Sequence, residues 1–256
     1  MIMIVLSMSY KEIYDQLAAD KEKVDWRKDY YYKKAIRELR KATSFPAYQC
    51  FDYESPNKNH YVISYFASDR HHIDQPIMGS FLVLYDNRKR YVVKWGAGGY
   101  QHTEESQIAF IRQIQVYTQH FFDRYKNRFI KKDLSSNDIA CHFFSRNQHA
   151  IPIQIDNRIN YNIDKYGNNA KQGIRVRDGF CFTKVGLEGR SSEDGDRLKD
   201  KINALCVLYT TFMREEDMKE MQQNAIKMEQ RVEMLRFQSS IRKQFPDGMI
   251  SFTLEH

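Results

Sequence analysis

Two copies of the string HFF-x-R lie close together in the sequence, at His120–Arg124 and at His142–Arg146. In a helix, residues four positions apart share a face, so each copy would present an imidazole beside a guanidinium. Arg128 extends the first stripe by one turn, and Lys131 and Lys132 follow it. Histidine transfers protons near neutral pH, and arginine donates paired hydrogen bonds to phosphate oxygens. These are the residue types that cleavage of RNA through its 2′-hydroxyl requires.

This chemistry gives each candidate a role. The candidates for proton transfer are His120 and His142. The candidates for binding phosphate or nucleic acid are Arg124, Arg128, Arg146, Lys131 and Lys132. A structural interpretation competes with this one, because helical histidine and arginine beside a stripe of rings often lie along the edge of a core. The neighbouring stripe of Phe121, Tyr125 and Phe129 has helical spacing and must face such a core.

The stripe also resembles a known group of proteins. A helix with H-x-x-x-R-x-x-x-R, a short helix, an Asp-Gly hairpin and a buried final strand are similar to the RelE/BrnT group of toxin-like small ribonuclease folds. The matching positions are His120, Arg124, Arg128, Asp178-Gly179 and Val207–Thr211. The resemblance covers about residues 114–213 and leaves the first hundred residues uncovered. It implies an RNA-cleaving or RNA-binding site near His120.

Composition and charge narrow the class of protein. The chain has 256 residues, 42% of them hydrophobic, which is enough for one large or two small domains with a real core. The formal net charge of +7 favours anionic partners such as RNA, although many basic proteins bind none. Four well-separated cysteines indicate buried thiols in a reducing, cytoplasmic setting. We expect no signal peptide, no membrane partner, no metal site and no cofactor.

The first hundred residues are predicted to form a half with helices and a sheet. We expect helices over 9–20 and 24–42, the second of them basic, followed by an antiparallel sheet with that helix on one face. The expected strands are Ala47–Tyr53, Tyr61–Phe66, Ser80–Tyr85 and Tyr91–Trp95. The glycine run 96–99 is expected to be a flexible turn, with Thr103 as a helix cap beyond it.

Residues 101–213 are predicted to form a second α+β half that carries both motif copies. Residues 104–129 fit either one long helix, or a helix, a strand at 114–117 and a second helix capped by Thr118. A helix over 133–147 should begin at Ser135 and end near Asn147. Strands are expected at Ile151–Ile155, Ile159–Ile163, Gly173–Val176, Phe180–Val185 and Ala204–Phe212, with Asp178-Gly179 as a tight hairpin and 186–201 as a mobile loop.

A long helix over 214–245 should close the fold. Apolar residues recur there at alternating spacings of three and four: Met218, Met221, Ala225, Met228, Val232 and Leu235. This heptad seam either docks on its own domain or pairs with a second copy, which would make a homodimer through residues 215–244. Residues 246–256 are expected to be a flexible tail ending in a tag remnant. The sequence therefore predicts an α+β protein with antiparallel sheets packed against helices. It favours an RNA- or phosphate-binding role, with a metal-independent endoribonuclease as its catalytic form; a non-catalytic, self-associating interaction protein is the alternative.

Overall fold

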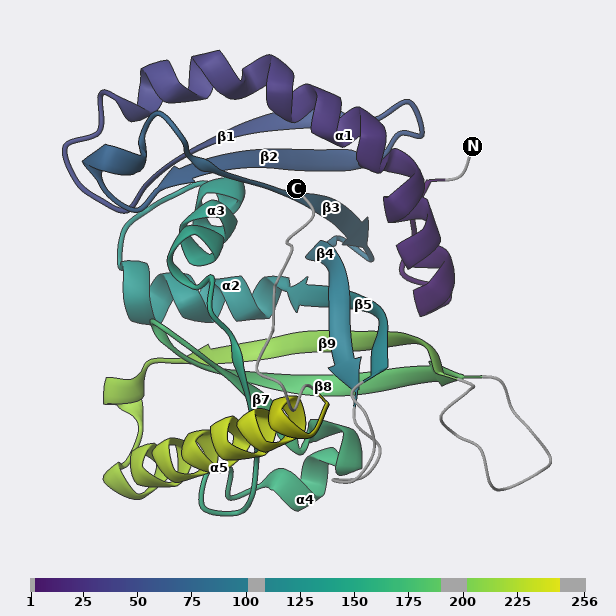
Figure 1. Cartoon of the computed structure of the whole chain (residues 1–256), viewed down its shortest axis with the longest axis vertical. Coiled ribbons are helices and arrows are strands. Elements are labelled where there is room, and N and C mark those ends of the chain that lie inside the picture. The colour runs from purple at the N-terminus through teal and green to yellow at the C-terminus, as the bar shows by residue number, and fades with distance from the viewer. Residues whose placement is uncertain (1–2, 101–108, 190–201, 245–256) are drawn as a thin grey trace.

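The computed structural model describes residues 3–100, 109–189 and 202–244, and in these residues nine strands form one sheet (Figure 1). Their order across the sheet is β1-β2-β3-β4-β5-β9-β8-β7-β6. The strands are β1 (Ala47–Glu54), β2 (His60–Ala67), β3 (Ile77–Asp86), β4 (Lys89–Tyr100), β5 (Ala109–Thr118), β6 (Ile151–Gln154), β7 (Gln172–Val176), β8 (Gly179–Gly189) and β9 (Ile202–Met213). The mixed helix-and-sheet architecture predicted from the sequence is confirmed.

The two halves expected from the sequence share this sheet. Strands β1 to β5 form an antiparallel meander, and β6 to β9 form a second antiparallel set. Parallel pairing of β5 with β9 joins them, and it places Tyr117 opposite Tyr209. Alternation along a strand shows which face is buried but not which edges pair, so the sequence does not predict this union. The expected boundary near residue 100 lies at the end of β4, which pairs with β5.

The outer face of β1 to β5 and β9 is covered by α1 (Tyr10–Leu39). This is one helix of 30 residues, where the sequence predicts two. Ser9 begins it with a capping box, in which its side chain accepts from the backbone of Glu12 and the Glu12 carboxylate accepts from the backbone of Ser9. No glycine or proline interrupts the segment, so the polar residues between the two predicted helices continue the helix.

The inner face of the sheet holds α2 (Gln119–Tyr125) and α3 (Ser136–Arg146), and the sheet curls around both helices (Figure 1). At one end of the sheet the ring of Tyr48 on β1 lies edge-on to His142. At the other end the β7–β8 turn pairs with Arg146. Because strands from both halves contact this helical pair, the motif region lies at the centre of the molecule.

Local signals position these two helices as the sequence indicates. Of the two alternatives for residues 104–129, the structure has the strand and the capped second helix, because β5 runs to Thr118 and the Thr118 hydroxyl then caps α2 by accepting from the backbone of Phe121. The helix expected before the strand is wrong at 109–113, where β5 has already begun. A π-helical turn, η2 (Lys126–Ile130), extends α2, and Lys131 in the left-handed region ends it. Ser135 caps α3 and Asn147 ends it, which confirms both predicted signals.

The outer face at the other end of the sheet is covered by α4 (Ile163–Tyr166) and α5 (Glu220–Gln244). The predicted strand at Ile159–Ile163 is wrong: Ile159 lies in a turn, and Ile163 begins α4. Their side chains still reach a core, but a turn and a short helix rather than strand pairing put them there. The preference of isoleucine for strands depends on its packing surroundings, so an isoleucine-rich run does not by itself fix a strand.

The structure does not show the predicted heptad packing of the C-terminal helix. Residues 215–217 form a short 3-10 turn, η5, and α5 begins only at Glu220. Met218, Ala225 and Ile226 are buried against β6, β8 and α4, whereas Met221 and Met228 are 52% and 56% exposed. Because α5 packs on a sheet and a helix, its buried face differs from the predicted seam. Three of the six seam residues, Met221, Met228 and Leu235, are exposed.

Other predictions have mixed outcomes. The glycines at 96, 98 and 99 belong to β4 and pair with β5, so the predicted flexible turn is wrong at these positions. Thr103, most of the loop 186–201 and the tail 246–256 lie outside the described residues. Cys141, Cys181 and Cys206 are buried and Cys50 is half-buried, all as free thiols. Among the described helices, none combines the length and the apolar character needed to cross a bilayer.

Candidate functional site

The two HFF-x-R copies meet through their phenylalanines. The ring centroids of Phe121 and Phe143 lie 5.1 Å apart, and those of Phe122 and Phe144 lie 6.1 Å apart. These rings join Tyr117 and its neighbours in the inner core, in edge-to-face arrangements that favour aromatic packing. The predicted ring stripe therefore faces the core, as its spacing indicates. The histidine and arginine of each copy lie at the borders of this aromatic cluster.

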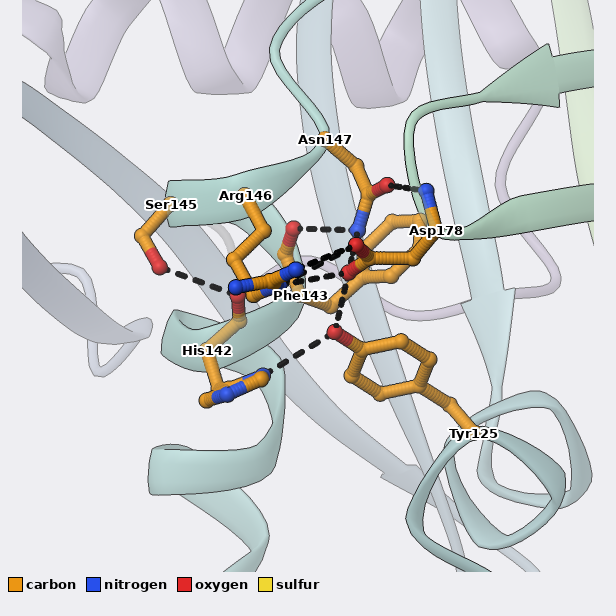
Figure 2. A network of polar contacts seen from close by, with 7 residues as sticks. All are labelled: Tyr125, His142, Phe143, Ser145, Arg146, Asn147 and Asp178. Carbon is orange, nitrogen blue, oxygen red and sulfur yellow. Dashed lines mark hydrogen bonds and ion pairs between the residues drawn. The ribbon is translucent and has the colours of Figure 1, made fainter. Parts of the chain in front are cut away.

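The cations of the second copy belong to a buried polar network around Asp178 (Figure 2). Arg146 Nε and Nη2 each donate to this carboxylate at 2.9 Å. Tyr125 Oη donates to Asp178 Oδ2 at 2.8 Å, and the Asn147 side-chain amide donates to the same oxygen at 3.0 Å. The carboxylate thus accepts from four donor groups, and its side chain is only 1% exposed. A buried charge this well paired fastens α2, α3 and the β7–β8 turn to one another.

The same network orients His142. Tyr125 Oη lies 2.9 Å from His142 Nδ1, and its single proton is already donated to Asp178. The tyrosine oxygen must then accept, so Nδ1 carries the proton of the neutral imidazole and Nε2 is unprotonated. Burial, followed by the nearby charge of Arg146, lowers the pKa of His142. Hydrogen bonding to Asp178 instead raises the pKa of Arg146, so this arginine keeps its charge.

The cations of the first copy lie on the surface. His120 and Arg124 are both exposed, and Arg124 Nε lies 3.4 Å from His120 Nε2, to which it donates. Within the described residues, Arg124 contacts no carboxylate. Arg128, half-buried on η2, donates from Nη1 to the backbone oxygen of Phe212 at 2.6 Å. Arg128 is therefore anchored to β9, while the contact that the described residues give Arg124 is the hydrogen bond to His120.

Two lysines follow the cations of the first copy in the sequence. We call the surface made by His120, Arg124, Arg128, Lys131 and Lys132 the basic face. Partial burial, followed by the charge of Arg124, lowers the pKa of Arg128. Asp217, at the end of η5, has its pKa lowered first by a hydrogen bond from Arg214, with smaller contributions from Arg128 and Lys131. Positive charge thus concentrates where α2, η2 and the end of β9 come together.

The structure separates residues that the sequence grouped. His142 and Arg146 have their own partners in the Asp178 network, whereas His120, Arg124, Lys131 and Lys132 are exposed on the basic face. Tyr125 belongs to α2 but points toward the second copy (Figure 2). Sequence reasoning missed three members of that network: Tyr125, Asn147 and Asp178. It treated them as a core ring, a helix end and a turn residue, and a buried carboxylate in a turn carries no local signal of its partners.

In comparisons with known proteins, no family model, no curated protein and no solved structure matches the chain. Within the described residues, no group of three or more histidine, cysteine, aspartate or glutamate side chains is placed to hold a metal ion. The basic face itself offers imidazole, guanidinium and ammonium groups, which suit an anionic ligand.

Proposed function

We propose that this protein binds RNA through the basic face. The observation that carries the proposal is the exposed Arg124 guanidinium, which contacts no carboxylate in the described part of the chain and lies beside His120 and near Arg128. A guanidinium in this position offers paired donors to a phosphate without first breaking an ion pair. Lys131 and Lys132, both exposed just beyond η2, add two further cations that can neutralise phosphates.

The second motif copy has a supporting role in this proposal. Arg146 donates from Nε and Nη2 to Asp178. If these donors turned to a phosphate instead, the buried Asp178 carboxylate would lose its cation. His142 donates its Nδ1 proton to Tyr125. We therefore infer that His142 and Arg146 hold α2 in place and that the basic face contacts the nucleic acid.

Binding of a labelled single-stranded RNA, followed by fluorescence anisotropy at several salt concentrations, tests this proposal. The variant Arg124→Ala/Lys132→Ala should weaken binding and lower the slope of log K against log salt by about 1.4, that is, about 0.7 for each lost phosphate contact. The matched control is Lys33→Ala/Arg37→Ala, which removes the same charge from exposed positions of α1 on the outer face. Equal effects of the two double variants would mean that binding follows net charge alone, and the basic face would lose its assignment.

A larger effect of the α1 control would also contradict the proposal. That surface has its own aromatic groups, because Arg27 lies 5.0 Å and 5.4 Å from the ring centroids of Trp26 and Tyr30, and both rings are exposed. Exposed rings between cations are suited to stacking bases. The control variant therefore compares two surfaces on opposite faces of the sheet.

The resemblance to the RelE/BrnT group extends this proposal to RNA cleavage without a metal ion. His120 is the residue of the basic face that can transfer a proton. Its Nε2 accepts from Arg124, so the neutral ring carries its proton on Nδ1 and can donate it. Incubation with end-labelled RNA should give products with the unaltered protein and none with His120→Ala. Equal degradation by both would identify a contaminating nuclease and remove the catalytic form, while leaving RNA binding open to the anisotropy test.

Self-association through α5 is the second candidate function, and the exposed side of its predicted seam favours it. Met221, Met228 and Leu235 are 52%, 56% and 65% exposed at seven-residue spacing, so they share one face. A hollow of about 460 Å³ runs beside the first two. Methionine adapts to irregular partners, and a second copy would cover this face.

Sedimentation velocity tests the candidate. Met221→Glu/Met228→Glu should convert a dimer to a monomer, whereas the control Gln238→Glu/Ser239→Glu, at exposed positions of the same helix, should leave the dimer intact. A monomeric unaltered protein at all concentrations would contradict self-association.

A further inference from the structure

A second cation that has no carboxylate partner among the described residues lies half-buried on the inner side of the sheet, away from the basic face. Lys94 is on β4, opposite Gln115 of β5, and two residues after the buried Val92. Side chains two positions apart on a strand share a face, so Lys94 points to the inner side of the sheet, beneath α3. Its ammonium lies 4.4 Å from the centroid of the Phe144 ring. It belongs to neither motif-derived group of cations.

Two cavities of about 160 and 320 Å³ lie next to this lysine. Lys94, Phe144 and Gln148 line both of them. Hydroxyl groups of Ser64 and Ser80 line the smaller cavity, and the rings of the larger one are those of Tyr117, Phe143, Phe144 and Tyr209. No aspartate or glutamate is among the residues that line either cavity, so Lys94 is the charged group there.

The ammonium of Lys94 has no hydrogen bond and no ion pair within the described residues; its contact is with the Phe144 ring. Burial lowers its pKa, which means that the surroundings do not compensate the charge. A half-buried, desolvated cation without an anionic partner is costly, and ionisable groups in such surroundings cluster at functional sites. Here it lies beside open space that an anion can fill, close to the 300–1,000 Å³ typical of small-molecule sites.

The neighbouring groups indicate which kind of anion. Tyr117 Oη donates to Gln115 Oε1 at 3.1 Å, and this fixes the amide so that its nitrogen is turned away and free to donate. Gln115 and Lys94 are directly opposite in the pairing of β4 with β5. An ammonium and an amide N–H side by side suit the two oxygens of a carboxylate. The stacked rings of Tyr117 and Tyr209, 4.0 Å apart, offer an aromatic wall beside them.

We propose that the space around Lys94 is a binding site for a small organic acid with a planar, apolar body, whose carboxylate pairs with Lys94. Gln115 supplies the second donor, and the rings of the larger cavity contact the body of the ligand. The binding energy comes from restoring a partner to a desolvated cation, where a charge pair is stronger than in water. This site is independent of the basic face and of RNA.

Benzoate is the probe, with benzyl alcohol as its neutral analogue. Calorimetry and ligand-observed NMR should show saturable binding of benzoate and at least ten-fold weaker binding of benzyl alcohol. Lys94→Met keeps the length of the side chain and removes the charge, and it should abolish the preference for benzoate. Lys89→Met, at an exposed position of the same strand, is the matched control and should bind as the unaltered protein does. Lys94→Met removes a half-buried charge that has no ionic partner in the described residues, so the melting temperature should not fall, and a folded variant is available for the comparison.

A second readout follows the lysine itself. In ¹³C-dimethylated protein, the Lys94 resonance should titrate at a lower pH than those of surface lysines. Benzoate should move that titration upward, because a bound anion favours the charged amine. Equal affinity of the unaltered and Lys94→Met proteins for benzoate would overturn the proposal, as would the absence of saturable binding. A borohydride-trapped adduct of Lys94 with benzaldehyde, without benzoate binding, would overturn the carboxylate assignment in favour of imine chemistry.

Discussion

The two copies of HFF-x-R contribute matching pairs of rings to one core but place their cations in different surroundings. In the first copy, His120 and Arg124 face solvent and contact each other. In the second, Arg146 pairs with Asp178 of the β7–β8 turn, and His142 contacts Tyr125 of α2 and the ring of Tyr48 on β1. The phenylalanines of both copies pack together, so the local pattern determines which side of each helix is apolar.

The difference lies in what the chain brings opposite each helix. Asp178 is 32 residues beyond Arg146 and reaches it only because β7 and β8 form a hairpin over the end of α3. Once a carboxylate is buried there, an arginine four residues after His142 becomes part of the protein interior. Among the described residues, the same string on α2 meets no such carboxylate, and its histidine and arginine stay exposed. Identical spacing therefore marks a structural pair in one helix and a candidate binding pair in the other.

The strongest test of this contrast removes the buried carboxylate. Asp178→Asn should lower the free energy of unfolding by about 3–5 kcal/mol, because it takes the charged acceptor away from the half-buried Arg146 and from the other donors of the network. Urea denaturation measures this loss. Asp123→Asn, at an exposed position of α2, removes the same charge and should change stability little. Similar losses for both variants would mean that Asp178 is no more structural than a surface carboxylate.

Exchanging the two arginines for alanine compares the copies directly. Arg146→Ala should cost about 2–3 kcal/mol, because it leaves the buried Asp178 without its cation while Tyr125 and Asn147 still donate to it. Arg124→Ala should change the free energy of unfolding by no more than about 0.5 kcal/mol. RNA affinity should show the reverse order. If Arg146→Ala weakens RNA binding more than Arg124→Ala does in folded protein, the second copy also binds RNA and is not purely structural.

Tyr125→Phe sharpens the comparison at the residue that connects α2 to the second copy. It removes one donor to Asp178 and the acceptor for His142 while keeping the ring in the core, so we expect a loss of about 1–2 kcal/mol. Tyr161→Phe, at a half-exposed ring, is the control and should be neutral within error. A neutral Tyr125→Phe would show that the hydroxyl adds nothing to the network.

The smallest expected effect is a pH dependence that belongs to the second copy. The pKa of His142 is lower in the folded protein than in the unfolded chain, so the unfolded state binds more protons as pH falls below about 6.5. Stability from this residue is complete above that pH and decreases until pH passes the folded pKa, with a slope of at most about 1.4 kcal/mol per pH unit. His142→Gln should remove this part of the slope between pH 7 and 5, as measured by urea denaturation. An unchanged slope would place the titrating group elsewhere.

Much of the fold is readable in the sequence because its signals are local. Hydroxyl caps at Thr118 and Ser135, alternation in the strands and the ring stripe from Phe121 to Phe129 each depend on neighbours within a few residues. These signals led to the mixed helix-and-sheet class and to most of the strands. They failed at Ile159–Ile163 and in the seam of α5, where the packing partner rather than the period decides which side is buried.

What the sequence by itself determined, then, is the identity of the cations and the faces of the helices that carry them. Only the tertiary structure decided which of those cations are internal, since the hairpin that delivers Asp178 and the parallel joining of β5 to β9 depend on contacts between distant segments. The same holds for Lys94. The sequence does not distinguish it from the other lysines, and only the folded sheet places it against the Phe144 ring and beside a cavity. A side chain's type is local, but its desolvation and its partners are set by whatever the rest of the chain places around it.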